Sequence, residues 1–290
     1  MKKATKKWWD RDPFKESAAI AYNAIFSLPG LLVVVVTLAG YFFGQEAVSG
    51  KLHQQMTGMM GAETADQIQK MIIAANKTRE SIWAAIIGVI TIIIGATGVF
   101  VQLQKSLNNI WDVKVSEKKS GIFIFLRTRL FSFGLIMSIA FLLLVSLVLS
   151  SVLSALGGWI SGNKSESLLI LFKILNFIIS LAIITVLFAL MFKILPDVKN
   201  KWQCIWIGAF LTALLFVVGK SALGLYFGKA EPGSGYGAAG SIILILLWAS
   251  YSSMIVFFGA EFTKVYSDYY YGELSPAENA EKKSNHESNR

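Results

Sequence analysis

The sequence predicts an all-α polytopic membrane protein with six transmembrane helices and both termini in the cytoplasm. Of its 290 residues, 54% are hydrophobic and 16% are charged, and the mean hydropathy is +0.57. A soluble domain of this length would expose far more charge. The apolar residues also fall in blocks of about 20 or more, the length that crosses about 30 Å of hydrocarbon. Because the blocks are apolar throughout and do not alternate in polarity, they favour helices over a β-barrel.

Six apolar blocks can be counted along the chain. In order they are Ala18–Phe43, Ile82–Leu103, Arg129–Leu156, Leu168–Leu195, Ile205–Phe227 and Gly240–Phe262. A cleaved signal peptide is disfavoured for the first block, because the block is nearly twice as long as an h-region and its leader contains three acidic residues. Crossing at every block places nineteen basic residues on the side of the termini and six on the other side. The positive-inside rule therefore predicts that both termini are cytoplasmic.

The chain divides into three predicted parts. A basic, aromatic N-terminal segment (1–17) precedes a six-helix transmembrane domain (18–271), and a polar tail (272–290) is predicted to be disordered in the cytoplasm. The external loop 44–80 is the longest connection. One helical face within it combines Ala65, Ile68, Met71, Ile72 and Ala75. This pattern predicts an amphipathic helix that caps the bundle or lies on the membrane.

Glu261 is the most notable charged residue, since it directly follows an apolar run in the last block. It lies about one turn before Lys264, near the predicted cytoplasmic boundary, where a charge costs less than at the membrane centre. Asn23, in the first block, lies at the same depth. Two interpretations of Glu261 are open: a structural ion pair or hydrogen-bonded anchor at an inner gate, or a substrate or proton site.

Two lysines and a proline are further candidates for a transport site. Lys173 and Lys220 lie in the outer halves of consecutive predicted helices. They either extend to the outer interface, as lysine side chains commonly do, or form a site for an anionic headgroup or solute. Pro29 is followed by a glycine within the first block, which predicts a break in that helix. Such a break is either an ordinary kink or part of a transport path.

The usual ligands and nucleophiles of hydrolytic enzymes are missing from the sequence. It contains two histidines and one cysteine, and no HxH, HExxH, CxxC or Walker motif. We therefore expect no catalytic residues, no metal, no cofactor and no enzymatic activity. The net charge of +9 follows the predicted membrane topology, so the expected partners are membrane lipids, including anionic ones, and not nucleic acid.

Several stretches resemble the YihY/BrkB family of bacterial inner-membrane proteins. They are SAAIAYNAIFSLPGLLVVV, LQKSLNNIWDVK, ILPDVKNKWQCIWIGAF and YGAAGSIILILLWASYSSMIVFFGAEFTKVY. The resemblance covers roughly residues 15 to 270, and the Gly-Ala-Glu step that ends at Glu261 is its most specific part. Asn23 departs from the pattern, because the family often carries a second tyrosine there.

The resemblance implies a six-helix protein of the bacterial cytoplasmic (inner) membrane with both ends in the cytoplasm. Members have often been labelled ribonuclease BN, which the missing catalytic motifs argue against, and the BrkB name carries an association with virulence. Glu261 and the loop residues Asn108, Trp111 and Asp112 match the family signature, which assigns them no defined role.

These observations lead to two functional hypotheses. The first is a transporter or flippase-like carrier of a lipid or amphipathic anion, in which Lys173 and Lys220 attract the anionic head and Glu261 gates transport or couples it to protons. The alternative is a non-transporting membrane scaffold for envelope partners. A carrier requires a continuous polar cavity that reaches Glu261, Asn23 and the two lysines, whereas a scaffold can be filled solid.

Overall fold

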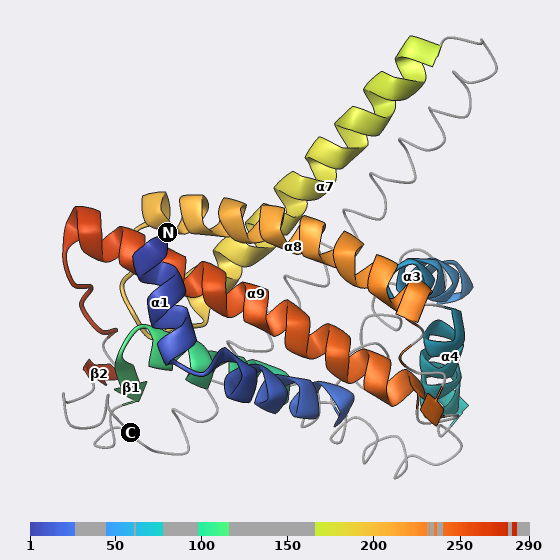
Figure 1. The fold of residues 1–290 in the computed structure, drawn as a ribbon, viewed down its shortest axis with the longest axis horizontal. Coiled ribbons are helices and arrows are strands. Elements are labelled where there is room, and N and C mark those ends of the chain that lie inside the picture. The colour runs from blue at the N-terminus through green and yellow to red at the C-terminus, as the bar shows by residue number, and fades with distance from the viewer. Residues whose placement is uncertain are drawn as a thin grey trace.

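The computed structural model describes residues 1–26, 45–60, 62–77, 98–115, 166–230, 232, 235–236, 240–277 and 280–282. This part of the chain is almost entirely helical (Figure 1). Its labelled helices are α1 (Lys2–Asp10), α3 (Gln45–Met60), α4 (Ala62–Lys77), α7 (Glu166–Ile194), α8 (Trp202–Ala230) and α9 (Gly240–Tyr271). Two further helical segments cover 13–26 and 98–110. The strands β1 (Val113–Val115) and β2 (Ala280–Lys282) pair antiparallel.

Three helices are long and apolar enough to cross a membrane. They contain the candidate spans Ile174–Ile194 in α7, Trp202–Ala230 in α8 and Ile242–Tyr271 in α9. The fourth, fifth and sixth predicted blocks are thus confirmed as helices. The first and second blocks are described only at 18–26 and 98–103, and the third lies outside the described residues. The count of six spans and the cytoplasmic position of the termini remain predictions.

α8 and α9 run side by side because each offers a glycine to a threonine of the other (Figure 1). A Cβ atom on Gly208 would overlap Thr263, and a Cβ atom on Gly259 would overlap Thr212. Each threonine hydroxyl donates to the carbonyl of the glycine four residues earlier in its own helix, at 2.7 Å. The hydroxyls are therefore satisfied within their helices, and small residues let the two backbones approach closely.

α7 packs on α8 through its C-terminal half and projects from the bundle with its N-terminal half (Figure 1). Phe188 and Phe192 lie in the core, where Phe188 meets Phe216 edge-on at a ring-centroid distance of 5.6 Å. The projecting half exposes apolar side chains, among them Leu171 and Phe177. Exposed apolar side chains on a helix of this length are typical of a surface that faces lipid.

α3 and α4 form a helical pair beside the end of α8 and the start of α9 (Figure 1). His53 of α3 contacts Asp66 of α4, with Nε2 and Oδ1 2.7 Å apart. Ala65 and Ile68 are buried, as the amphipathic pattern predicts. The helix predicted in loop 44–80 is confirmed, while the side chains of Met71, Ile72 and Ala75 lie outside the described residues.

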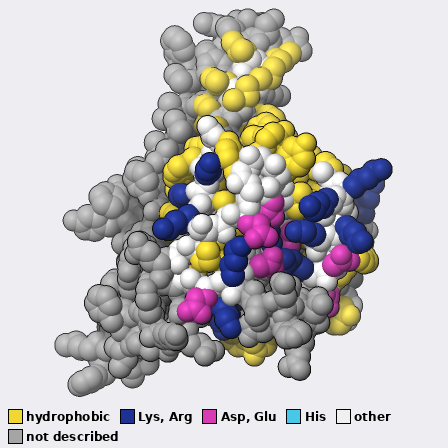
Figure 2. All heavy atoms as spheres, turned by 90° about the vertical axis from the view of Figure 1, so that its left-hand side faces the viewer, with side chains coloured by type: hydrophobic (Ala, Val, Ile, Leu, Met, Phe, Trp, Pro, Cys, Tyr) yellow, Lys and Arg dark blue, Asp and Glu magenta, His cyan; other side chains and the backbone are white. Residues whose placement is uncertain are grey.

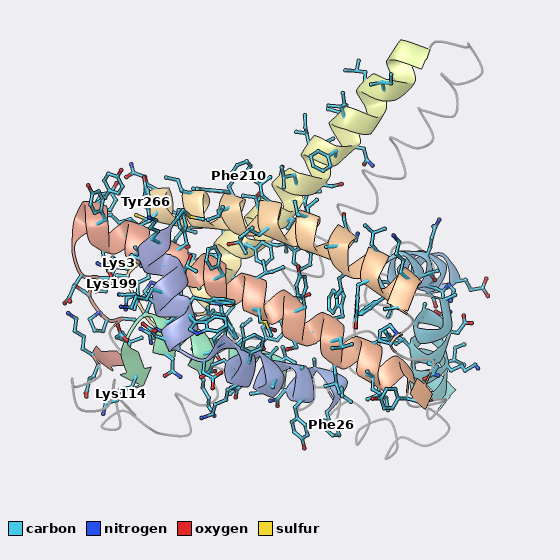
Figure 3. The ribbon with its side chains drawn as sticks, viewed as in Figure 1. Lys3, Phe26, Lys114, Lys199, Phe210 and Tyr266 are labelled. Carbon is cyan, nitrogen blue, oxygen red and sulfur yellow. The ribbon has the colours of Figure 1, made fainter. Side chains whose placement is uncertain are left out.

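At the opposite end of α9, segments from across the sequence meet in what we call the charged end. It comprises α1, residues 98–115, the loop 195–201 and the C-terminal residues 272–277 and 280–282. Figure 2 faces this end and shows a central group of acidic side chains with Lys and Arg around it. Lys3, Lys114 and Lys199 lie here and come from three separate elements (Figure 3).

The structure corrects part of one expectation at the charged end. Residues 272–290 are predicted to be disordered, yet within this tail β2 pairs with β1, and Pro276 forms an isolated bridge with Val198; residues 278–279 and 283–290 lie outside the described residues. The backbone groups of this polar segment are satisfied by strand pairing, which its composition does not reveal. The last helix continues past the end of the last apolar block, Phe262, to Tyr271. This extension packs against the other elements, since Thr263 and Lys264 are buried and Lys264 pairs with Asp112.

Candidate functional site

Glu261 forms an ion pair with Arg11, a residue that sequence analysis placed merely in the basic N-terminal segment. Arg11 Nε lies 2.5 Å from Glu261 Oε1. Glu261 is fully buried, whereas the Arg11 side chain is 29% exposed. The second carboxylate oxygen of Glu261, Oε2, is also buried and has no hydrogen-bond donor among the described residues. An ion pair at Glu261 is therefore present, while its role, a structural anchor or a substrate or proton site, stays a prediction.

α1 places Arg11 at this position. The helix ends at Asp10, Arg11 follows it, and Asp12 turns the chain with a positive φ of 50° that aspartate tolerates better than most residues. Asp12 Oδ1 accepts a hydrogen bond from the Lys15 backbone at 3.3 Å, so Asp12 also caps the helix that starts at residue 13. This start agrees with the sequence, where a proline follows Asp12.

Trp8 attaches α1 to α9. Its indole Nε1 donates to the Met254 carbonyl at 3.2 Å, and its ring meets Phe258 edge-on at 5.9 Å. A partly buried indole with a satisfied N–H supplies both apolar contact and direction. Trp8 therefore sets the position of α1 one turn before the arginine.

Asp112 joins a second acid to the same arginine. Arg11 Nη2 donates to Asp112 Oδ1 at 2.8 Å, and Lys264 donates to the other oxygen of this carboxylate. Arg11 Nη1 also donates to the Asn109 carbonyl at 2.5 Å. Asp112 has a φ of 54°, in the turn that ends the helical segment 98–110. The result is a chain of alternating charges that runs Glu261, Arg11, Asp112, Lys264.

These contacts shift the pKa values of Asp112 and Arg11, the two members of this chain of charges that lie outside the candidate spans. Burial alone would raise the pKa of Asp112, but hydrogen bonds from Lys264 and Arg11 outweigh burial and hold that pKa below its ordinary value. Burial would lower the pKa of Arg11, but Glu261 and Asp112 outweigh burial and raise it. Both groups are therefore charged at neutral pH.

A polar cavity of about 360 Å³ opens beside this chain of charges, between α1, the start of segment 13–26, the end of segment 98–110 and α9. Its lining includes Arg11, Asp112 and Glu261. Glu16 lies on its wall, where it accepts hydrogen bonds from Ser106 Oγ at 2.5 Å and from Asn109 Nδ2 at 3.4 Å. The cavity thus connects the buried Glu261 to the charged end.

The other two signature residues, Asn108 and Trp111, contact elements next to the site and do not line the cavity. Asn108 Nδ2 donates to Asp197 Oδ2 at 2.7 Å, and the Asp197 backbone N–H donates to Asn108 Oδ1 at 2.8 Å. This reciprocal pair fixes the loop 195–201 against segment 98–110. Trp111 is buried beside Phe192, at a ring-centroid distance of 6.3 Å. We assign Asn108 and Trp111 to positioning.

The remaining predicted residues are not brought to the cavity within the described part of the chain. Asn23 donates to the Ala19 carbonyl at 2.8 Å and faces Gly98, where segments 13–26 and 98–110 meet. Lys220 is exposed on α8. Lys173 belongs to α7, but its side chain lies outside the described residues, as does Pro29 entirely.

Three residues of the site carried no signal that the sequence analysis could use. Arg11 was one basic residue among many in the N-terminal segment, and Glu16 and Asp197 were two acids near predicted interfaces. Each is defined by a partner far away in the sequence. No three His, Cys, Asp or Glu side chains of the described ranges are grouped so that they could hold a metal ion.

Three helices long and apolar enough to cross a membrane indicate an integral membrane protein. The Virulence factor BrkB family matches residues 4–284, and the chain belongs to this family. Similar proteins are UPF0761 membrane proteins from Pseudoalteromonas atlantica, 26% identical over 91% of this chain and 84% of that protein, and from Tolumonas auensis, 27% identical over 88% and 81%. A third, from Haemophilus influenzae, is 24% identical over 84% and 86%. No solved structure matches.

Proposed function

We propose that this membrane protein is a transporter or flippase-like carrier of a lipid or an amphipathic anion, and that it catalyses no covalent change. The observation that supports the proposal best is the polar cavity of about 360 Å³ whose lining includes the fully buried Glu261 on an apolar helix. Ionisable residues within membrane helices that face a cavity typically mark substrate or ion paths.

In this proposal the pair of Arg11 and Glu261 forms the cytoplasmic gate. Arg11 is supplied by α1, a short helix that packs on α9 and belongs to none of the candidate spans. Movement of α1 would separate the pair without disturbing the contact between α8 and α9. Asp112 would hold Arg11 during that movement, since it binds a different nitrogen of the guanidinium group.

The anionic part of the proposal depends on Lys173 and Lys220, which would attract an anionic head from the outer side. Their prediction is tested by the pair of variants Lys173→Ala and Lys220→Ala. If the lysines take part, both variants should slow the transport of anions and leave the transport of a neutral or zwitterionic lipid unchanged. Transport of every tested anion at the wild-type rate in both variants would remove the lysines from the mechanism.

A scaffold for envelope partners is the second candidate. It is favoured by the contact between α8 and α9, where Gly208 and Gly259 leave no room for a Cβ atom. The scaffold is also favoured because Glu261 already forms an ion pair with Arg11, and such a pair can stabilise the structure without a substrate. A solidly packed bundle can present surfaces to partners without moving.

The deciding experiment is flux in proteoliposomes. Purified wild-type protein and Glu261→Gln would be assayed for movement of fluorescent lipids and of small anions, with and without a proton gradient. Glu273→Gln serves as a matched control, because Glu273 pairs with Lys282 on the exposed surface, away from the cavity. Flux that depends on the protein and falls only in Glu261→Gln supports a carrier. No flux with any variant supports the scaffold.

A further inference from the structure

The inner face of α1 is occupied by contacts to the rest of the protein. Ala4 is fully buried, Trp8 donates to the α9 backbone, and Arg11 pairs with a carboxylate of the same helix. These residues follow one another at spacings of four and three, which puts them on one side of α1. The contacts that position α1 therefore come from this side and leave the opposite side available.

The outer face of α1 carries an open groove of about 490 Å³. The groove is lined by six exposed residues: Met1, Lys2, Thr5, Lys6, Trp9 and Asp10. Lys2 and Lys6 form no ion pair with any residue that the structure describes. Two ammonium groups one helical turn apart thus face outward, with the acid of Asp10 at the far end of the same face.

The orientation of α1 places this groove at the edge of the bundle. α1 crosses α9 instead of running along it, whereas α8 and α9 run side by side (Figure 1). A helix that crosses the spans and combines lysine with exposed tryptophan has the features of a helix in the headgroup region of a bilayer. The positive-inside rule accounts for lysines on this side of the membrane, but not for their alignment beside an exposed aromatic ring.

An exposed aromatic face continues from the groove along segment 13–26. Trp9 meets Phe14 edge-on at a ring-centroid distance of 6.0 Å. Phe14, Tyr22 and Phe26 are 54%, 63% and 66% exposed, and their spacings of eight and four residues put them on one side of the helix. Phe26 points away from the bundle in Figure 3. Apolar surface of this kind is suited to acyl chains.

The order of these two surfaces identifies the kind of partner. A phospholipid has a charged phosphate that is followed by apolar chains, and the protein offers a basic groove that is followed by an aromatic face. A free phosphate or an acidic peptide would use the groove and leave the aromatic face uncovered. The charge of the groove favours an anionic lipid over a zwitterionic one, because each lysine near the surface attracts net negative charge.

We propose that the outer face of α1 and the aromatic face of segment 13–26 form one binding site for an anionic phospholipid. Lys2 and Lys6 bind the phosphate. Trp9 and Phe14 lie beside the glycerol, and the rings farther along segment 13–26 contact the acyl chains. The lipid is a bound partner and not the cargo, so the site is independent of the proposed carrier function.

The test is fluorescence quenching in bilayers that contain the purified full-length protein. A fluorophore at Thr5→Cys reports lipid at the groove, in a Cys204→Ala background because the native cysteine is buried. Brominated phosphatidylglycerol and brominated phosphatidylcholine with identical chains are compared. Phosphatidylglycerol is expected to bind more tightly, by about fivefold for each of the two lysines. Equal quenching by the two lipids would overturn the proposal.

The informative variant combines Lys2→Gln with Lys6→Gln. Glutamine is about as good a helix former as lysine, so α1 should fold normally, and the preference for phosphatidylglycerol should disappear. Lys229→Gln is the matched control, since Lys229 is an exposed lysine in the last turn of α8. Its preference should equal that of the wild type. A double variant that keeps the wild-type preference would contradict the assignment of the phosphate to these lysines.

The acyl part of the site is tested by lipid retention in detergent, measured by native mass spectrometry. Tyr22→Ala combined with Phe26→Ala should lower retention of both lipids by the same factor, because their chains are identical. Leu225→Ala is the control, since Leu225 is 65% exposed on α8. Wild-type retention in the aromatic variant would remove segment 13–26 from the site.

Soluble glycerophosphoglycerol separates a lipid from a free phosphate ester. It has the headgroup of phosphatidylglycerol and no chains, so it should not displace the lipid at equal concentration. Displacement would overturn the lipid part of the proposal. The preference for phosphatidylglycerol should also fall between about 0.1 M and about 1 M salt, where the Debye length shortens from about 10 Å to about 3 Å. A preference that salt leaves unchanged would contradict binding through the two ammonium groups.

Discussion

α9 is held on two sides by opposite chemistry. Against α8, Gly208 and Gly259 make room for threonines of the facing helix, and the contact depends on shape. Against α1, Arg11 reaches the buried Glu261 and the contact depends on charge. Both contacts lie on the same helix within a few residues, since Gly259 and Glu261 are two positions apart.

The difference shows which of the two contacts can act as a switch. Close packing of small residues in a lipid environment needs no partner charge and is insensitive to pH or salt. A buried ion pair is favourable only while both partners are in place, because either one alone is a desolvated charge. We infer that the α1 contact is the element that can open and the α8 contact the element that stays closed.

The largest effect is expected when Arg11 is replaced by alanine. Glu261 and part of Asp112 would lose their counter-charge, and loss of one partner of a buried pair costs about 3–5 kcal/mol. Because the Arg11 side chain is 29% exposed, we expect the lower end of this range. The free energy of unfolding in detergent measures the loss, and hydrogen exchange in α1 should rise with it.

The matched control for Arg11→Ala is Lys282→Ala. Lys282 and Glu273 form a pair whose side chains are 54% and 81% exposed, and exposed pairs contribute about 0–1 kcal/mol. The double variant Arg11→Ala with Glu261→Gln should recover part of the stability, since no buried charge is left alone. Equal losses for Arg11→Ala and Lys282→Ala would show that burial of the pair is unimportant.

The packing side of the comparison is tested with Gly208→Ala. The added Cβ would overlap Thr263, and overpacking of this kind costs about 1–3 kcal/mol. Gly224→Ala is the control, since nothing lies within 4 Å of a Cβ atom there. Alanine is about 1 kcal/mol more favourable than glycine within a soluble helix, so the control should be neutral or stabilising. Melting temperatures that move the same way for both would refute the close-contact account.

Acid should weaken the charged contact and leave the packed one intact. Since the pKa of Asp112 is held below its ordinary value of about 3.9, its stabilising contribution is complete above that pH and is lost as pH falls through the lower, folded-state pKa. With screening at a half-exposed side chain, we expect about 0.5–1 kcal/mol. At pH 6, wild type should melt at a higher temperature than Asp112→Asn. Below pH 3, the melting curves of the two proteins should coincide.

The smallest effect is expected from truncation after Ala277, which removes β2. A two-stranded pair is marginally stable by itself, so global stability should fall by less than about 1 kcal/mol. Backbone amides at Val113 and Val115 should exchange faster, whereas α8 and α9 should not change. Loss of folded protein on truncation would mean that β2 is required to assemble the charged end.

Much of the fold could be predicted because the preference of a segment for the membrane depends on its local composition. Runs such as those in α7, α8 and α9 must be helical in hydrocarbon whatever their neighbours, since each helix satisfies its own backbone. The helix around Ala65 and Ile68 follows from spacing alone. Hydropathy does not give the ends of the helices, since α9 continues nine residues beyond the apolar block that ends at Phe262, where polar side chains such as Lys264 have partners.

The candidate site was predicted only in part. Glu261, Asn108, Trp111 and Asp112 were singled out by position and by resemblance, and the structure brings Glu261 and Asp112 to one cavity. The sequence does not distinguish Arg11 as a site residue, because the positive-inside rule leads us to expect basic residues before a first span. The partner of Asn108, Asp197, was likewise one acid of a connecting loop.

The sequence by itself determined that the protein belongs in a membrane, that its long apolar segments are helices, and that a carboxylate follows one of them. The tertiary structure alone decided the partner of that carboxylate and placed it on the wall of a polar cavity. The physical reason is the distance along the chain over which each interaction acts. Hydrophobicity acts on each segment in turn, whereas Arg11 and Glu261 have partners only after distant parts of the chain have packed together.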